Sequence, residues 1–232
     1  GVERAVTFDI KYQGGVVAEI IHSLAKWKRY ALKRYGIPCG EGLYTDMNAI
    51  RRDEELDNIH SIYVDQWDWE RVITREERTR EYLIDTVKRI VGVICDTNDL
   101  LKVDFPELSV NLTREVKVID SEELLSLYPD LTPKEREYEI VKKYKTVLIV
   151  GIGAKLSNGE PHDGRAPDYD DWALNGDILI WYPVLNRSVE ISSMGIRVDE
   201  NSLREQLKKA GCEKRAELSF HKMLLNGELP LT

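Results

Sequence analysis

The chain has 232 residues and carries 33 Lys and Arg side chains against 41 Asp and Glu, which gives a formal net charge of −8. An acidic balance without a basic run argues against a protein whose main partner is nucleic acid, although a small basic pocket could still hold phosphates. Three scattered cysteines are too few for a disulfide framework or a zinc cage, so we expect free thiols in a reducing, cytoplasmic setting, and the apolar runs are too short to span a membrane.

Apolar spacing predicts strands and helices along the whole chain. In chain order, strands are expected over Val6–Ile10, Val16–Ile21, Gly42–Ile50, His60–Val72, Thr146–Ile152, Gly176–Leu185 and Val189–Val198. Helices are expected over Leu24–Gly36, Arg75–Leu101, Ser121–Leu127, Asn201–Ala210 and Ala216–Asn226, and one more begins at Thr132-Pro-Lys-Glu135. Many strands meet through hairpins, which predicts an α+β fold with a largely antiparallel sheet flanked by helices.

The most informative segment is His60–Arg71, which gathers polar residues on one face of a strand. Alternate residues share a face, so Val64, Gln66, Asp68 and Glu70 lie together. Burying such a face is costly unless its groups meet cations or donors, and a ligand with an amine and a flat apolar ring would suit it. The alternative is an amphipathic strand with a solvated acidic face, and the spacing does not decide between the two.

Three other segments could carry chemistry. Asp177 and Glu190 lie on neighbouring predicted strands, where they could share a divalent cation or form an incidental pair on a surface hairpin. Arg197 offers a guanidinium suited to a carboxylate or phosphate. The charged segment His162–Trp172 reads as a loop that is either functional or simply exposed. Ser23 lies at a strand-to-helix junction, as a helix cap or part of an anion site.

Several familiar signatures are missing from the sequence. It has no complete dinucleotide fingerprint, no Walker lysine loop and no Gly-x-Ser-x-Gly elbow. Its four histidines lack metal-ligand spacing, and His221 is expected on a helix surface. The cysteines lie in no recognised nucleophile setting, so we expect inert thiols.

Five motifs together resemble one family. They are His22-Ser-Leu-Ala-Lys-Trp-Lys-Arg, Gly40-Glu-Gly-Leu-Tyr-Thr, Tyr63-Val-Asp-Gln-Trp-Asp-Trp-Glu, Arg165-Ala-Pro-Asp-Tyr-Asp-Asp-Trp and Ser192-Ser-Met-Gly-Ile-Arg. Nearly the whole chain is similar in register to the ammonia-dependent asparagine synthetases, or aspartate–ammonia ligases. The resemblance implies a fold like the catalytic domain of class II aminoacyl-tRNA synthetases, with residues 1–232 as a single catalytic domain.

The resemblance also implies a reaction. Aspartate, ATP and ammonia would give asparagine, AMP and diphosphate, with magnesium at the phosphates. The side-chain carboxylate of aspartate would attack the α-phosphorus of ATP to form an aspartyl adenylate, and ammonia would then displace AMP. Such a step between anions rests on positioning and charge neutralisation. A homodimer is implied, with no nucleic-acid or membrane partner.

The site residues follow from the same resemblance. Arg51 matches an arginine that grips the α-phosphate and the substrate carboxylate, and Asp68 suits the substrate ammonium. The expected catalytic residues are Arg51, Asp68 and Glu190, and the magnesium pair is Asp177 and Glu190. The positions that match aspartate contacts are Ser23, Lys28, Gln66, Asp68, Ser193 and Arg197. The positions that match ATP contacts are Arg51, Val64, Arg165, Asp170, Asp177, Glu190 and Ser192.

The chain also departs from the family pattern. The family continues beyond both ends and carries a longer loop between Trp172 and Ala173, so we expect the chain to be incomplete at both ends and near residues 172–173. Two alternatives remain, a non-catalytic paralogue that binds aspartate or a nucleotide, and a tRNA synthetase catalytic core. Retention of the whole residue set argues against the first. The net charge of −8 and the lack of an anticodon-binding module argue against the second.

Overall fold

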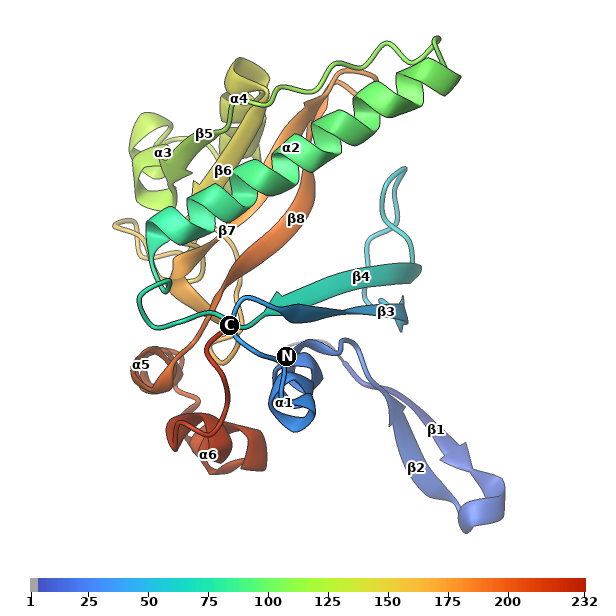
Figure 1. Cartoon of the computed structure of the whole chain (residues 1–232), viewed down its shortest axis with the longest axis vertical. Coiled ribbons are helices and arrows are strands. Elements are labelled where there is room, and N and C mark those ends of the chain that lie inside the picture. Colours follow the sequence, from blue (N-terminus) through green and yellow to red (C-terminus); the bar gives the residue numbers. More distant parts are fainter. Residues whose placement is uncertain (1–3) are drawn as a thin grey trace. The chain divides into compact units, whose positions relative to one another are not determined.

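A computed structural model describes residues 4–232 of the chain. The chain divides into two compact units. The first unit consists of residues 1–74 together with Lys222–Thr232, and the second consists of Arg75–His221. Each unit has its own strands and helices (Figure 1). The expectation of a single catalytic domain over residues 1–232 stays a prediction.

The first unit contains two antiparallel hairpins and a helix. Its elements are β1 (Val6–Ile10), a 3-10 turn (Lys11–Gln13), β2 (Val16–Ile20), α1 (Ala25–Tyr35), β3 (Gly42–Ile50) and β4 (Tyr63–Arg71). Helix α1 packs against β3 and β4, and its Ala31 and Leu32 are both buried. It ends at Gly36, whose φ of 63° is readily adopted only by a residue without a Cβ.

The C-terminal segment belongs to this first unit, and Figure 1 shows its end beside the β3–β4 hairpin. The Ile73 N–H donates to the Leu231 carbonyl at 2.9 Å, and Arg29 Nε donates to the Pro230 carbonyl at 2.8 Å. Thr232 Oγ1 donates to the buried Glu70 carboxylate at 2.7 Å. These bonds give the polar end of β4 a partner from the far end of the chain.

The second unit is built on a four-stranded sheet with the order β5-β6-β7-β8. The β5–β6 pair is parallel and the other two pairs are antiparallel. Its elements are α2 (Arg80–Asp104), β5 (Lys117–Asp120), α3 (Ser121–Leu127), α4 (Pro133–Tyr144), β6 (Thr146–Val150), β7 (Asp170–Tyr182), β8 (Arg187–Arg197), α5 (Glu200–Lys209), a 3-10 turn (Glu213–Glu217) and α6 (Ser219–Leu225), which crosses the unit boundary.

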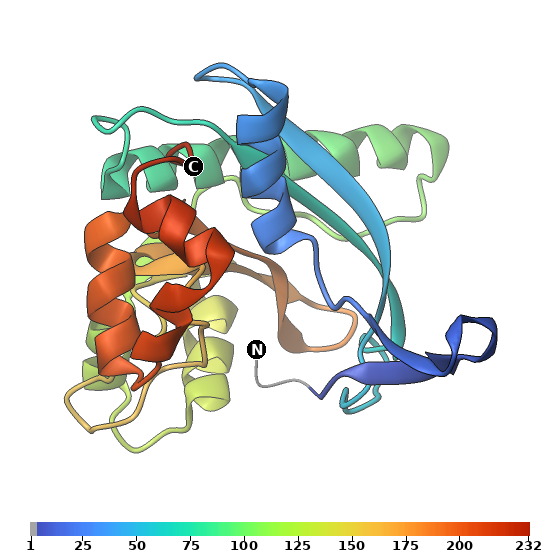
Figure 2. The same cartoon turned by 90° about the horizontal axis from the view of Figure 1, so that it is seen from below.

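Helices cover both faces of this sheet, so its central strand β6 is buried throughout. Side chains alternate along a strand, and Val147 and Ile149 share one core cluster with Leu124 of α3 and Ile140 of α4. Figure 2 shows α2 on the opposite side of the sheet from α4. The sequence of β6 is therefore a continuous apolar run rather than an alternation of apolar and polar residues.

The structure confirms the α+β class and the dominance of antiparallel pairing. Strand β7 begins at Asp170 rather than Gly176, because this acidic stretch pairs with the end of β8. Strand β5 was not predicted, since four residues are too few for a pattern. The last predicted helix is two pieces, the 3-10 turn and α6. Within residues 4–232, no helix combines the length and the apolar surface that a membrane span requires.

Candidate active site

An ion pair joins α1 to β4 in the first unit. Lys28 is completely buried, and its ammonium donates to Asp68 Oδ2. The other carboxylate oxygen of Asp68 accepts a bond from the Trp69 N–H at 2.8 Å. The Asp68 side chain itself is 41% exposed, so it can still meet a ligand from solvent. Lys28 is therefore one of the cation partners that a partly buried polar face requires.

The two faces of β4 differ as the alternation predicts. Val64, Gln66 and Asp68 are half-buried and Glu70 is fully buried, whereas Trp67 on the other face is 77% exposed. The acidic face is therefore only partly solvated, because Lys28 of α1 binds Asp68 and Thr232 of the C-terminal segment binds Glu70. Three predicted site residues, Val64, Gln66 and Asp68, share this polar face.

Ser23 is exposed at the start of α1. Its hydroxyl accepts a hydrogen bond from the Ala25 N–H at 3.1 Å. Leu24 occupies the N-cap position of the helix and makes no side-chain cap. Ser23 is therefore a cap only in part. It accepts a hydrogen bond from the first turn of the helix, but it lies one residue before the N-cap position.

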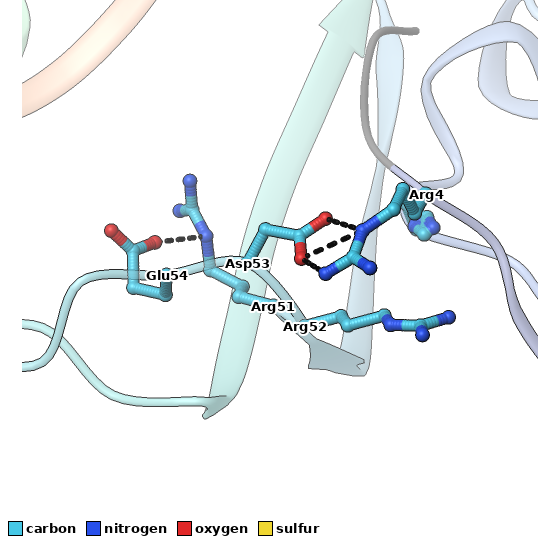
Figure 3. A pocket seen from close by; sticks show the side chains of 6 residues that line it. Arg4, Arg51, Arg52, Asp53 and Glu54 are labelled. Carbon is cyan, nitrogen blue, oxygen red and sulfur yellow. Dashed lines mark hydrogen bonds and ion pairs between the residues drawn. The ribbon is translucent and has the colours of Figure 1, made fainter.

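A cavity of about 160 Å³ surrounds the side chain of Arg51. Figure 3 shows Arg51 Nε bound to Glu54 while the two terminal nitrogens extend beyond that bond. The Nε to Oε2 distance is 2.6 Å. Arg4 makes a forked contact with Asp53. The residues that line the cavity are Arg4, His22, Arg51, Arg52, Asp53 and Glu54. Three guanidinium groups face two carboxylates here, so the cavity suits an anion.

Two carboxylates occupy one face of β7 and β8 in the second unit. Asp177 is buried and pairs across the strands with Ser193, whose hydroxyl bonds to it. Glu190 pairs with Leu179 beyond a bulge in β8 and is more exposed. Burial raises the pKa of Asp177 above its ordinary value, although Arg165 opposes this. Burial and the charge of Asp177 raise the pKa of Glu190 to about 7.

Cations lie close to this acidic pair. Arg165 donates to Asp177 Oδ1. Lys134 of α4 lies 3.0 Å from the Glu137 carboxylate. Burial alone would lower the pKa of Lys134, but Glu137, Asp163 and Glu190 together raise it. Lys134 and Arg165 oppose the rise in the pKa of Glu190 but do not outweigh burial and the charge of Asp177. Two neighbouring carboxylates are oxygen donors of the kind that a hard cation such as Mg²⁺ accepts beside phosphates.

The number of ligating side chains near this pair limits the assignment. Among the described residues, no group of three or more His, Cys, Asp or Glu side chains could hold a metal ion. Two carboxylates still fit Mg²⁺, which keeps waters and takes its other ligands from substrate phosphates. The structure therefore fits a cation held jointly with a nucleotide rather than an all-protein metal cage.

Arg197 lies at the end of β8, on the same face of the sheet as Asp177. It is buried, its Nη1 donates to Asp170 Oδ1, and its guanidinium lies 3.8 Å from the centre of the Tyr169 ring. The structure thus brings together two residues that the sequence assigned to different substrates, Asp170 and Arg197. Ser192 pairs with Ile178, next to Ser193 along β8, so alternation places its side chain on the opposite face.

The acidic stretch that leads into β7 and forms its first residues is not an exposed loop. Asp168, Asp170 and Asp171 are all buried. His221, which was predicted on a helix surface, is also buried, and its Nε2 lies 2.8 Å from Asp168 Oδ2. That prediction was wrong because α6 packs its histidine against a carboxylate distant in sequence, and the spacing within α6 carries no signal of it.

His162 was likewise missed as a buried group. Its side chain is buried, and its Nε2 lies 3.2 Å from Glu137 Oε1. The predicted loop position was correct, but its depth was not. A histidine among Asp, Gly and Pro residues reads as solvent-exposed, and only the packing of α4 reveals its partner.

Comparisons with known proteins give one consistent result. A family model described as aspartate-ammonia ligase matches residues 1–232. A protein of Ruminiclostridium cellulolyticum named aspartate–ammonia ligase is 59% identical over 232 residues, which cover 100% of this chain and 69% of that protein. A namesake from Lactobacillus johnsonii is 58% identical over 233 residues, with the same coverage.

Solved structures support the fold. Asparaginyl-tRNA synthetase of Entamoeba histolytica, in complex with asparaginyl-adenylate, matches with a TM-score of 0.63 at 14% identity, covering 97% of this chain and 52% of that one. Aspartyl-tRNA synthetase from the same organism matches with a TM-score of 0.63 at 15% identity, covering 91% and 45%. At such identities the likeness concerns the fold alone, and it confirms the class II synthetase-like architecture.

Proposed function

The chain belongs to the aspartate–ammonia ligase family, and we propose that it converts L-aspartate, ATP and ammonia into L-asparagine, AMP and diphosphate. The observation that supports this most strongly is the 59% identity over all 232 residues to a relative of that name. The reaction would proceed through a β-aspartyl adenylate, in which the side-chain carboxylate of aspartate is joined to the α-phosphate. Ammonia would then attack the activated carbonyl and release AMP.

In the first unit, we assign aspartate recognition to the polar face of β4. Asp68 would accept the α-ammonium of the substrate, since one of its oxygens is already held by Lys28 and the side chain remains 41% exposed. Gln66 lies on the same face, and Ser23 belongs to the helix start that carries Lys28. A carboxylate that is fixed by a buried lysine keeps its position when the substrate arrives.

In the second unit, the aspartate contacts would be Ser193 and Arg197. A guanidinium matches the two oxygens of an α-carboxylate. Asp170 binds the edge of the Arg197 guanidinium, and the Tyr169 ring lies against it. Recognition of this carboxylate would therefore depend on a preformed arginine rather than on a mobile one.

We assign ATP recognition to positions that match ATP contacts in the family. Arg51 lines an anion-binding cavity, so it suits the α-phosphate, where charge develops during attack. Val64 would lie beneath the adenine. The resemblance also assigns Arg165 and Asp170 to the nucleotide, whereas the pairing of Ser192 with Ile178 turns its side chain away from the face of Asp177, so Ser192 is not kept in this set. Asp170 also accepts a hydrogen bond from Arg197, the residue that is assigned to aspartate.

Asp177 and Glu190 would hold Mg²⁺. When bound, the ion would neutralise phosphate charge as a hard Lewis acid. Burial, and after it the charge of Asp177, raises the pKa of Glu190 to about 7 when no cation is bound. Arg165 offsets part of the Asp177 charge through its ion pair with that residue.

We further propose a cytoplasmic homodimer, as the family resemblance implies. The free state of Cys39, Cys95 and Cys212 is compatible with a reducing compartment. Sedimentation of the purified protein would test the dimer, and a mass of one chain at micromolar concentration would contradict it.

One experiment tests the proposed activity. Purified protein is incubated with aspartate, ATP, Mg²⁺ and ammonium, with and without tRNA, and AMP and asparagine are quantified. We expect both products in equal amounts, independent of tRNA and dependent on aspartate. AMP formation that requires tRNA would point to a synthetase core, and the absence of both products would contradict the proposal.

A further inference from the structure

One buried side chain outside the assigned set holds the segment that supports Arg197. Gln206 lies on α5 and is 4% exposed. Its amide nitrogen donates to the Pro167 carbonyl at 3.1 Å and to the Asp170 carbonyl at 3.0 Å. Its amide oxygen accepts from the Trp172 N–H at 2.8 Å. One carboxamide thus satisfies three backbone groups of a single short segment.

Two of these bonds hold backbone groups at an interruption in the pairing of β7 with β8, and the third holds Pro167 just before β7 begins. Asp170 pairs with Arg197 across β7 and β8, but the next pair is Asn175 with Gly195, so the register is interrupted between them. Backbone groups in such a stretch need partners other than the neighbouring strand. A carboxamide has two donors and an acceptor, and Gln206 uses all of them here.

Neighbouring contacts fix the rest of the segment. Asp168 meets His221 at 2.8 Å and Arg215 at 3.2 Å, and Asp171 pairs with Arg78. The Tyr169 carbonyl accepts from the Val198 N–H at 2.9 Å, adjacent to Arg197. Only Gln206 among the side chains named here binds the backbone on both sides of Tyr169.

We propose that Gln206 is a positioning residue for substrate recognition. It holds Tyr169 and Asp170 so that the Arg197 guanidinium presents one fixed face to the α-carboxylate of aspartate. This rests on the proposed function, which assigns that carboxylate to Arg197. Gln206 touches no substrate, so its effect appears in the affinity for one functional group rather than in the chemical step.

The deciding variant is Gln206→Glu, which keeps the shape and the acceptor but cannot donate to the two carbonyls. A second variant, Gln206→Met, is similar in length and neutral. The matched control is Glu205→Gln, the adjacent residue on the same helix, whose side chain is 71% exposed. Circular dichroism and thermal melting show whether each full-length variant folds.

The readout compares aspartate with β-alanine, which has the same reacting carboxylate and amine but lacks the α-carboxylate. For both Gln206 variants we expect the KM for aspartate to rise about tenfold or more, with kcat and the KM for ATP within about twofold. Turnover of β-alanine should stay unchanged, so discrimination between the two substrates falls. The control should match the wild type throughout.

Each other outcome contradicts the inference in a recognisable way. Equal losses with aspartate and β-alanine, or two variants that do not fold, would make Gln206 a purely structural residue. Unchanged kinetics would mean that residues 167–172 keep their position without the hydrogen bonds from Gln206. A wild-type protein that does not distinguish aspartate from β-alanine would instead overturn the assignment of Arg197, and one without any activity would overturn the proposed function.

Discussion

Lys28 and Asp68 form an ion pair whose two members differ sharply in exposure. The lysine side chain is 0% exposed and the aspartate side chain is 41% exposed. The lysine therefore cannot leave the pair for solvent, whereas the carboxylate can accept a second cation. Helix α1 supplies the fixed charge and strand β4 supplies the adaptable one.

The first prediction concerns this pair. Asp68→Asn preserves the shape of the side chain and removes the charge that would bind the substrate ammonium. Loss of a charge-assisted bond of this kind typically costs about 2–5 kcal/mol, so aspartate affinity should fall roughly 30-fold or more. ATP affinity should change little. Calorimetric titration of each ligand measures both.

A double variant separates binding from stability. Removing Asp68 alone leaves Lys28 as a buried, unpaired charge, which also destabilises the fold. Asp68→Asn combined with Lys28→Met should recover stability without recovering aspartate affinity. A large loss of ATP binding with normal aspartate affinity would show that this face of β4 points toward the nucleotide.

The acidic pair on β7 and β8 yields a second prediction. Glu190→Gln removes one proposed magnesium ligand, so adenylate formation should slow by at least about tenfold, far more than aspartate binding weakens. Rapid-quench measurement of the first turnover gives the rate. Glu160→Gln, an exposed carboxylate of the same unit, serves as the control. A normal rate at saturating Mg²⁺ would show that Glu190 holds no ion.

The third prediction concerns the nitrogen donor. Glutamine-dependent enzymes need a nucleophile, commonly a cysteine, to release ammonia. Burial raises the pKa of Cys95, which disfavours the reactive thiolate. Ammonium should support asparagine formation, and glutamine should support it poorly or not at all, as chromatography of the product will show. Cys39→Ala, at an exposed thiol, should keep full ammonium-dependent activity.

A fourth prediction concerns the cap of α5. Asp199 Oδ1 accepts bonds from the Asn201 and Ser202 N–H groups at 3.0 and 2.8 Å. Asp199→Ala should lower the free energy of unfolding by about 1 kcal/mol near neutral pH. Asp199→Asn should lose less, because an amide oxygen still caps the helix.

The pH dependence of this effect has a definite sign. Burial alone would raise the pKa of Asp199, but the bonds from Ser202 and the charge of Arg78 lower it overall. Because the pKa of Asp199 is lower in the folded state than in the unfolded state, ionised Asp199 stabilises the fold at pH values above its unfolded pKa of about 3.9. This stabilisation is lost as the pH falls through the pKa of Asp199 in the folded state. The difference between wild type and Asp199→Ala should therefore shrink in acid. A difference that grows in acid would contradict the cap.

The fifth prediction uses two glycines in different settings. A Cβ on Gly42 would overlap the backbone carbonyl oxygen of Glu70 on β4, which cannot move aside easily. Gly42→Ala should cost about 2 kcal/mol in urea unfolding. Gly92 lies inside α2, and apart from its chain neighbours and the backbone of its own helix no atom lies within 4 Å of an added Cβ, so Gly92→Ala should stabilise by about 0.5–1 kcal/mol. A neutral Gly42→Ala would show that the hairpin adjusts.

The sequence by itself determined the features that depend on near neighbours. Thr132 and Glu135 form the expected capping box of α4, and the predicted bounds of β3 and α3 are confirmed. Caps and periods act over a few residues, so they can be read locally. The motifs also carried the family resemblance, because they record residue types and their order.

Only the tertiary structure decided which of these residues meet. Lys28 finds Asp68 at a distance of 40 residues in the sequence, and Gln206 reaches Pro167 over 39. His221 was misjudged for the same reason, since its partner lies 53 residues away. A charged side chain becomes buried, paired or available through the packing of whole elements, and packing depends on surfaces that no single segment contains.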